Sequence, residues 1–246
     1  MTDEQTRGVL LVVLGATAVL LWWSGDALNY VRPGLAPYLL VSGVVVLLLG
    51  LLPPLGLLGD QAAGHAGGHG GQRHRARVGW LLLVPVLVVM LVQPTALGSY
   101  AVSSRSAVPG GDGGFEPLAA PVRGAVPMSM AEFVTRALRD PGQSLAGVRV
   151  RLVGFVSPGG GAGNYLLTRF VLFCCAADAE ALQAEVRGDP TPRARDQWLE
   201  VEGTWLPRPT AADDGPIPPP PALHVDSVRP VAPPRPPYEY SLFFSG

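Results

Sequence analysis

The sequence is short of charge and lacks lysine. Asp, Glu, Lys and Arg make up 15% of the 246 residues, against about 25% in ordinary soluble domains. All 18 basic residues are arginine, and the formal net charge is −1, so no charge excess points to a nucleic-acid partner. Two cysteines exclude a scaffold built on several disulfides. Since 48% of the residues are hydrophobic and the mean hydropathy is +0.29, the composition disfavours an ordinary cytosolic enzyme.

The excess of apolar residues lies in three nearly charge-free runs at 8–23, 36–58 and 78–97. A membrane-spanning helix needs ~20 apolar residues to cross ~30 Å of hydrocarbon. The pattern therefore predicts a transmembrane anchor over 1–98, with helices at about 8–24, 36–58 and 78–97. A cleaved signal peptide is the less favoured alternative for the first run, because two acids against one arginine precede it and no small-residue cleavage site follows it.

Arginines near the predicted membrane are unevenly divided between its two sides. One side carries four arginines, which are Arg7, Arg73, Arg75 and Arg77. The other side carries two, which are Arg32 and Arg105. The positive-inside rule then places the N-terminus in the cytoplasm and everything after residue 97 outside, in a multi-pass protein of the cell membrane. Since no Asp, Glu, Arg or His lies inside the three runs, we expect the anchor not to carry an ion alone.

A histidine-bearing loop at 59–77 joins the second and third predicted helices. It contains three of the four histidines: His65, His69 and His74. Imidazoles are good ligands for zinc and other transition metals, and Asp60 or water would complete a tetrahedral shell. The glycine-rich sequence opposes this, because ordering such a loop costs conformational entropy. A metal contact and a plain cytoplasmic linker both remain open.

The segment after the anchor begins with a Gly, Pro and Ser-rich stretch at 99–125, which we interpret as a linker. A helix is predicted next, because Ser129 and Glu132 form a capping-box pattern. Its apolar side chains share one face: Met130, Phe133, Val134, Ala137 and Leu138. Pro141–Gly142 is expected to end it.

Five strand candidates follow the predicted helix. They lie at 148–156, 165–173, 182–187, 197–206 and 222–231. Short strands in this number predict a small β-barrel or sandwich over 126–232. The Pro-rich tail at 233–246 is predicted to be an extended strap or disordered. The whole chain is thus expected to be an α+β membrane protein.

Adjacent Cys174 and Cys175 end the second strand candidate, with Asp178 close behind. These side chains suit a soft metal such as zinc. A strained vicinal disulfide and a bridge to a partner are further hypotheses, and simple packing of one thiol is another. Since alternating strand geometry points the two sulfurs to opposite faces, joint chelation requires a turn or bulge here.

No known catalytic motif occurs in the sequence, so we expect no enzyme. GGGAG at 159–163 follows a strand candidate but opens no predicted helix, and His224 lies in a strand candidate. A thiol oxidoreductase using the cysteine pair ranks last, because adjacent cysteines lack the helix N-terminus that stabilises a catalytic thiolate.

Several motifs resemble a known family: RFVLFCCAADA at 169–179, WLEVEGTW at 198–205 and PPYEY at 236–240. With the predicted anchor and His-bearing loop, they make the chain similar to the YcgQ-like bacterial membrane proteins, which are regarded as subunits of a two-component permease. The resemblance covers nearly the whole chain. It implies an OB-like exported domain, a multi-spanning permease encoded nearby as partner, and no established activity or substrate. The matching positions, without known roles, are Arg169, Phe170, Cys174, Cys175, Ala177, Asp178, Trp198 and Gly203.

Three functions are weighed on these grounds. The leading hypothesis is a non-enzymatic accessory subunit that binds a permease through its helices and uses the exported domain to capture or gate substrate. The second is metal handling by Cys174, Cys175 and Asp178 outside and by the three loop histidines inside. The third is thiol redox chemistry. Lipid is the expected surrounding of the anchor, and no nucleic-acid partner is expected.

Overall fold

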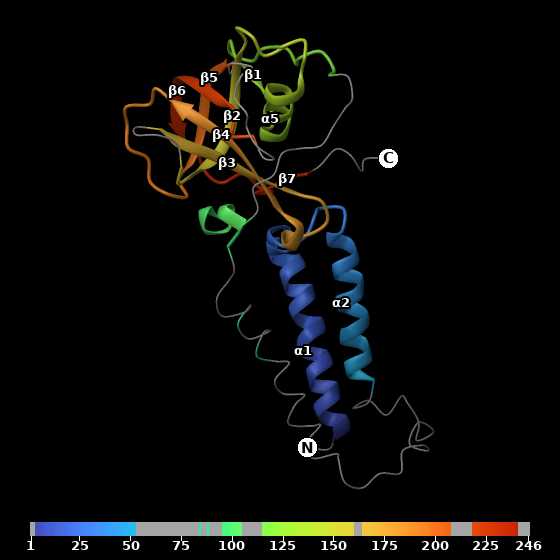
Figure 1. Ribbon diagram of the computed structural model, residues 1–246. Coiled ribbons are helices and arrows are strands. Elements are labelled where there is room, and N and C mark those ends of the chain that lie inside the picture. Colours follow the sequence, from blue (N-terminus) through green and yellow to red (C-terminus); the bar gives the residue numbers. More distant parts are fainter. Residues whose placement is uncertain are drawn as a thin grey trace. The chain divides into compact units, whose positions relative to one another are not determined.

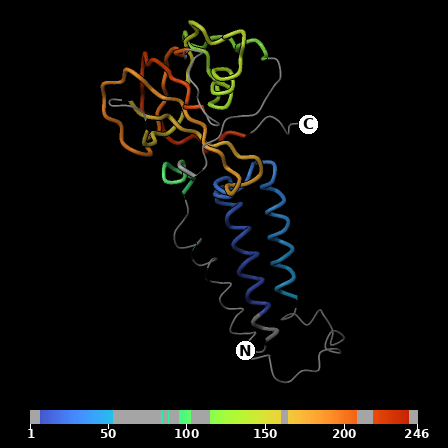
Figure 2. The backbone as a smooth tube through the Cα atoms, viewed as in Figure 1, coloured from blue at the N-terminus to red at the C-terminus, as the bar shows by residue number. Residues whose placement is uncertain are grey.

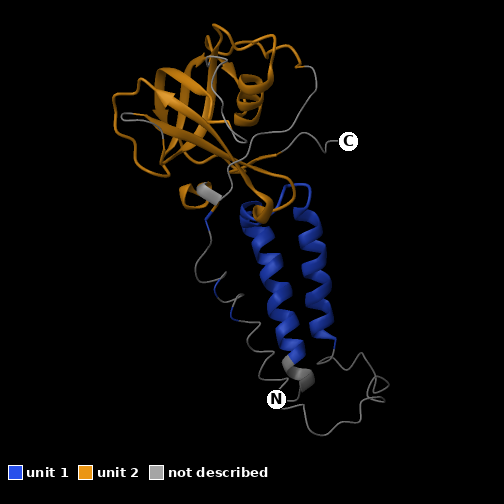
Figure 3. Ribbon diagram, viewed as in Figure 1, with its two compact units in different colours: residues 1–95 blue, residues 96–246 orange. Residues whose placement is uncertain are grey.

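The computed structural model describes residues 3–52, 84, 88, 95–104, 115–159, 164–207 and 218–240. The chain divides into two compact units, Met1–Thr95 and Ala96–Gly246 (Figure 3). The predicted α+β class is confirmed, because the first unit is helical and the second is built around a β-barrel.

Two helices form a hairpin in the first unit, α1 (Asp3–Ser24) and α2 (Ala36–Leu51), joined through the short 3-10 helix η1 (Asp26–Asn29). They pack through glycines: a Cβ on Gly15 would lie 2.5 Å from the backbone nitrogen of Leu47, and one on Gly50 would lie 2.7 Å from that of Val12. This close approach leaves long apolar side chains on the outside of the pair. Interfaces of small residues of this kind are typical of membrane helices.

One of these helices passes a length and composition test for crossing a membrane. Arg7–Ser24 of α1 gives 18 residues of mean hydropathy 1.7, and α2 is a shorter apolar helix. A signal sequence would pass the same test as α1. Of the third predicted span, the structure describes Val84 and Val88, both helical, and residues 95–97. The rest of that span and residues 53–58 of the second lie outside the described residues.

The helix predicted after the linker is α5 (Met130–Arg139). Ser129 caps it, with its hydroxyl oxygen accepting a hydrogen bond from the Glu132 N–H at 3.0 Å. Met130, Phe133 and Val134 are buried, and Ala137 and Leu138 pack against the same core, as the helical spacing predicts. The helix ends at its C-cap Asp140, directly before Pro141.

Five strands close into a barrel (Figures 1 and 2). They are β2 (Arg149–Ser157), β3 (Tyr165–Leu172), β4 (Glu180–Arg187), β5 (Trp198–Leu206) and β6 (Ala222–Pro230). Their order around the barrel is β2-β3-β4-β6-β5, and β5 pairs back to β2. The β4–β6 pair is parallel and the other four pairs are antiparallel. Of the two architectures predicted, barrel and sandwich, the structure is therefore a barrel.

Alternation of side chains along the strands fills the barrel interior. In β5, Leu199, Val201, Gly203 and Trp205 are buried, while the residues that alternate with them are half-buried. This alternation is what made β5 predictable from the sequence. Two-residue strands add to the sheet at its ends: β1 (Val126–Pro127) pairs parallel to β2, and β7 (Glu239–Tyr240) pairs parallel to β3.

A second, smaller core lies outside the barrel interior. It contains Phe155, Phe170 and Leu172 from the strands, together with Tyr238 from the tail. Ala101 and Val102 also belong to it, and they come from the 3-10 helix η3 (Ser99–Ser104). Part of the predicted linker at 99–125 therefore packs on the barrel, and part of the Pro-rich tail forms a strap that ends in β7.

Candidate functional site

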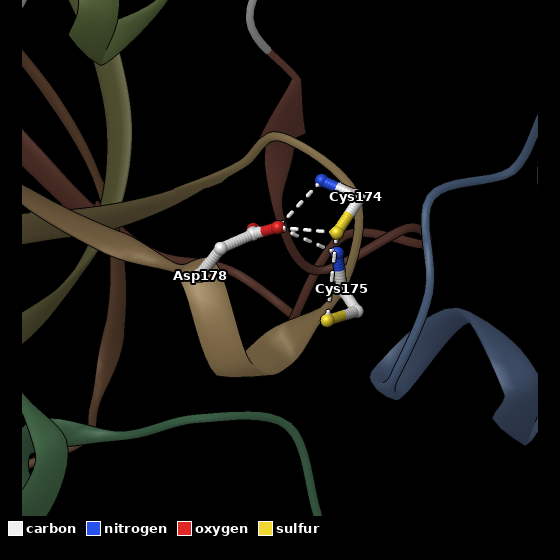
Figure 4. A group of neighbouring side chains, drawn as sticks. All are labelled: Cys174, Cys175 and Asp178. Atoms are coloured by element: carbon white, nitrogen blue, oxygen red, sulfur yellow. Dashed lines mark hydrogen bonds between the residues drawn. The ribbon is translucent and has the colours of Figure 1, made fainter.

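The cysteine pair lies in the turn between β3 and β4. Cys174 and Cys175 follow the last residue of β3 by two and three positions, and the short 3-10 helix η4 (Ala176–Asp178) comes next. Cys174 is exposed and Cys175 is half-buried. Figure 4 shows both side chains and Asp178 converging in this turn.

Asp178 organises the turn through its carboxylate. Its Oδ1 accepts a hydrogen bond from the Phe173 N–H at 3.0 Å. Its Oδ2 accepts from the N–H groups of Cys174 at 2.9 Å and Cys175 at 3.1 Å. The backbone N–H of Asp178 in turn bonds the Cys175 carbonyl at 3.0 Å. A short acidic side chain that satisfies successive N–H groups is a common way to hold a tight turn.

Both thiols are free, and they lie on the same side of the turn. The two Sγ atoms are 3.6 Å apart, too far for a disulfide bond. The Cys174 Sγ lies 2.6 Å from Asp178 Oδ2, to which it donates a hydrogen bond. The turn supplies the geometry that joint chelation requires, because strand alternation no longer separates the sulfurs.

Electrostatics hold the Cys174 thiol in its protonated form. The hydrogen bond to Asp178, and after it the one to Cys175, raises the pKa of Cys174 to about 12. Partial burial alone would raise the pKa of Asp178, but the hydrogen bonds from the Cys174 thiol and from three backbone N–H groups hold it below its ordinary value. At neutral pH the pair is therefore a thiol beside a carboxylate.

The turn can offer a metal ion three ligand atoms. One atom each from Cys174, Cys175 and Asp178 lies within 4.8 Å of the others. Two sulfurs and one oxygen suit zinc, with a fourth position left to solvent or another donor. The histidines of the sequence hypothesis, His65, His69 and His74, lie outside the described residues.

The remaining family-motif residues lie on the barrel. Phe170 stacks with Phe155 at 5.8 Å between ring centroids, and Trp198 meets Phe155 edge-on at 5.6 Å. The Arg169 guanidinium lies over the Trp198 ring, 5.0 Å from its centroid. Ala177 lies within η4.

Gly203 lies at an irregularity between β5 and β6, where the register shifts. A Cβ at this position would overlap the carbonyl oxygen of His224. The motif glycine is thus required by a close approach of two strands. The exposed side chain of His224 lies on β6.

Glu239 in the C-terminal tail has a structural role that the sequence did not predict. Its Oε1 and Oε2 accept hydrogen bonds from the N–H groups of Met130 at 2.8 Å and Ala131 at 3.0 Å, at the start of α5. A carboxylate is favoured at a helix N-terminus, although burial raises the pKa of Glu239. The isolated acid in the PPYEY segment was the available signal, but its partner lies 109 residues away.

Comparison with known proteins gives a family for the barrel domain and little else. Residues 132–241 match the family described as the DUF1980 C-terminal domain, which is uncharacterised. No curated protein matches the chain. A crystal structure of a proposed aspartyl-tRNA synthetase from Leishmania major Friedlin is similar at 14% identity, with a TM-score of 0.27, over 47% of this chain and 22% of that one. That likeness is too slight to carry an argument.

Proposed function

We propose that the protein is a membrane-anchored, non-enzymatic accessory subunit of a transport system, with its barrel outside the cell membrane. In this proposal the helices form a multi-pass anchor that binds a permease partner, and the barrel captures or gates substrate. The observation that carries the proposal is the apolar exterior of the α1–α2 hairpin.

The exterior of that hairpin is apolar along both helices. Leu20 of α1 is 55% exposed, and Val41 and Leu48 of α2 are 61% and 54% exposed. A soluble helical hairpin would present polar side chains at such positions. Trp23 and Tyr38 are also exposed, as expected of aromatic residues at a membrane interface. These features support insertion into lipid or against the helices of a partner.

We infer that the barrel is of the OB type. Taken in chain order as strands one to five, β2, β3, β4, β5 and β6 close in the order 1-2-3-5-4, and the third and fifth are parallel. OB barrels are Greek-key barrels of five strands that bind small or polymeric ligands on one face and in two loops. The proposed external location favours a transport substrate over a nucleic acid.

Labelling of a single thiol tests the proposed topology. Ser227 is exposed on β6, so Ser227→Cys in a Cys174→Ser, Cys175→Ser background offers one accessible thiol on the barrel. We expect an impermeant maleimide to label it on intact cells, and to label a matched Gln5→Cys variant only after lysis. Labelling of the barrel thiol only after lysis would contradict the external location.

Co-purification tests the partner. Extracted in mild detergent, the full chain is expected to bring down a multi-spanning permease encoded beside it, while an unrelated membrane protein with the same tag does not. A chain that migrates alone under all such conditions would contradict the accessory role. Since topology and partnership are measured separately, either part of the proposal can fail without the other.

A second candidate function, metal handling, is favoured by the three ligand atoms within 4.8 Å in the cysteine turn. We propose zinc or another transition metal as cargo. The protonated Cys174 thiol must lose its proton to bind, so uptake is expected to strengthen as pH rises. The same protonated state does not favour the alternative of a thiol oxidoreductase, which needs a thiolate.

Metal analysis of the full chain decides this second candidate. After incubation with zinc and removal of the excess, wild type is expected to retain about one equivalent, and the Cys174→Ser, Cys175→Ser variant less. A His65→Ala, His69→Ala, His74→Ala variant separates the loop histidines from the cysteine turn. Equal, negligible zinc in wild type and in the cysteine variant would exclude the turn as a metal site.

A further inference from the structure

The barrel opens into a fork between β2 and β3. These strands pair only from Phe155–Thr168 to Ser157–Leu166. Beyond these three residue pairs the two strands diverge. There β2 pairs with β1 at Val150 and Arg151, and β3 pairs with β7 at Val171 and Leu172. A cleft of about 380 Å³ lies in this fork, lined by Arg151, Arg169, Glu200 and Glu239 among others. Its volume falls within the range of small-molecule sites.

Arg169 lines the cleft with an unsatisfied guanidinium. Its side chain is only 7% exposed, and its Nε and Nη1 atoms have no hydrogen-bond acceptor among the described residues. The Trp198 ring, whose centroid lies 5.0 Å from the guanidinium, offsets part of the free-energy cost of burying this charge. A buried cation without an acceptor is nonetheless costly, and proteins normally pair it.

The acidic residues around the cleft are already engaged. Glu200 pairs with Arg229 at 2.7 Å and lies 3.7 Å from Arg151, and Arg151 also pairs with Glu202 at 2.8 Å. Both carboxylate oxygens of Glu239 accept N–H groups of α5. Glu239 therefore acts on Arg169 through its charge, without a hydrogen bond to it.

We propose that the fork cleft is a binding site for a small oxyanion, a carboxylate or phosphate group, held by Arg169. The planar guanidinium matches either group as a multiple donor and is more weakly hydrated than an ammonium, so it serves well in a partly closed cleft. Trp198 fixes the guanidinium from one side and leaves its N–H donors for the anion. The site is separate from the cysteine turn and needs neither a metal nor a particular membrane topology.

The test is a titration of the full chain in detergent, labelled with ¹⁵N-arginine, with inorganic phosphate and separately with acetate at constant ionic strength. The Arg169 Nε resonance is identified by its absence in both Arg169→Gln and Arg169→Lys, so the assignment survives if one of the two variants fails to fold. We expect that resonance to shift saturably with at least one of the two anions. Isothermal titration calorimetry on the same samples is expected to show binding at least about tenfold weaker in Arg169→Gln.

Arg149→Gln is the matched control, because Arg149 lies on β2 as an exposed residue paired with Asp226 at 2.8 Å. It should bind the anion as wild type does, and Arg169→Lys should retain part of the affinity. A wild-type Arg169 signal that does not saturate with either anion overturns the proposal, even if Arg169→Gln fails to fold. Equal weakening in Arg149→Gln and Arg169→Gln would overturn it as well, because the effect would then be one of net charge.

Discussion

At the scale of single residues, the cysteine turn shows one carboxylate setting both a conformation and a protonation state. Asp178 accepts three backbone N–H groups and one S–H group. The same side chain therefore aligns the two sulfurs and keeps Cys174 protonated. A metal ion would have to displace this hydrogen bond before it could use the sulfur.

Asp178→Asn is expected to make Cys174 more reactive. Without the negative charge, the pKa of Cys174 falls from about 12 toward the ordinary thiol value, so the thiolate fraction at about pH 8 rises. Alkylation by iodoacetamide should accelerate at least about tenfold, the gain being reduced because lower-pKa thiolates are weaker nucleophiles. Mass spectrometry of the modified peptide, with Cys175 as internal reference, measures the rate. An equal acceleration at both cysteines would mean that the turn had opened instead.

At the scale of strands and helices, the barrel depends on places where backbones come unusually close. Gly203 is one of them, at the β5–β6 irregularity. Further irregular places lie at the fork, where β1 and β7 replace the β2–β3 pairing.

Gly203→Ala is expected to destabilise the barrel by about 2–4 kcal/mol, because the added methyl group would overlap the His224 carbonyl oxygen and push β5 from β6. Thermal or denaturant unfolding followed by tryptophan fluorescence measures the change. Thr204→Ala, next in the same strand, adds no atom and should cost far less. Similar losses in the two variants would show that the close approach is not what the glycine provides.

Removal of the tail strand provides a second test at this scale. Truncation before Tyr238 deletes a residue that is 3% exposed in the second core and removes the Glu239 contacts to α5. We expect a clear drop in the unfolding midpoint, with α5 becoming more open to hydrogen exchange. Truncation after Tyr240 keeps all of these contacts and is the control. A midpoint that is the same for both truncations would contradict a structural role for the tail.

The regular helices and strands could be predicted from the sequence, but the contacts between residues far apart in the chain could not. The five barrel strands were predicted within about two residues because they are short apolar runs bounded by turn residues, and α5 because its cap and apolar face are local. The strands β1 and β7 have two residues each, too few for any period. The sequence placed Cys174 and Cys175 at a strand end, but their convergence depends on Asp178. The setting of Arg169 depends on the fork between β2 and β3, where β1 and β7 come from distant parts of the sequence.

At the scale of the whole molecule, one buried carboxylate joins the loop after β4 to the barrel and is expected to contribute to its response to acid. Asp189 in the loop after β4 is buried and accepts hydrogen bonds from Arg193 at 2.7 and 3.2 Å and from the Tyr165 hydroxyl at 3.2 Å. Burial would raise the pKa of Asp189, but the bonds from Arg193 and Thr191 hold it below its ordinary value. A carboxyl with a lowered pKa stabilises the folded state above its unfolded pKa, and that stability is lost as pH falls through the folded value.

We therefore expect the barrel to lose stability as pH falls below about 4. Asp189→Asn should cost about 2–4 kcal/mol at neutral pH by leaving Arg193 without its charge partner, and should flatten the acid decline. Urea unfolding of the full chain in detergent at about pH 7 and about pH 3 measures both effects. A variant that keeps the full pH dependence of wild type would assign the acid response to other carboxyls.

The hydrogen bonds between Glu239 and the start of α5 also have a consequence for biosynthesis. Glu239 and the strand that borders β3 are synthesised 109 residues after the start of this helix. Until that segment has left the ribosome, the domain lacks it and so stays short of its final state. This delay would suit the export that we propose for the barrel, because a chain crosses a bilayer more readily before it folds tightly.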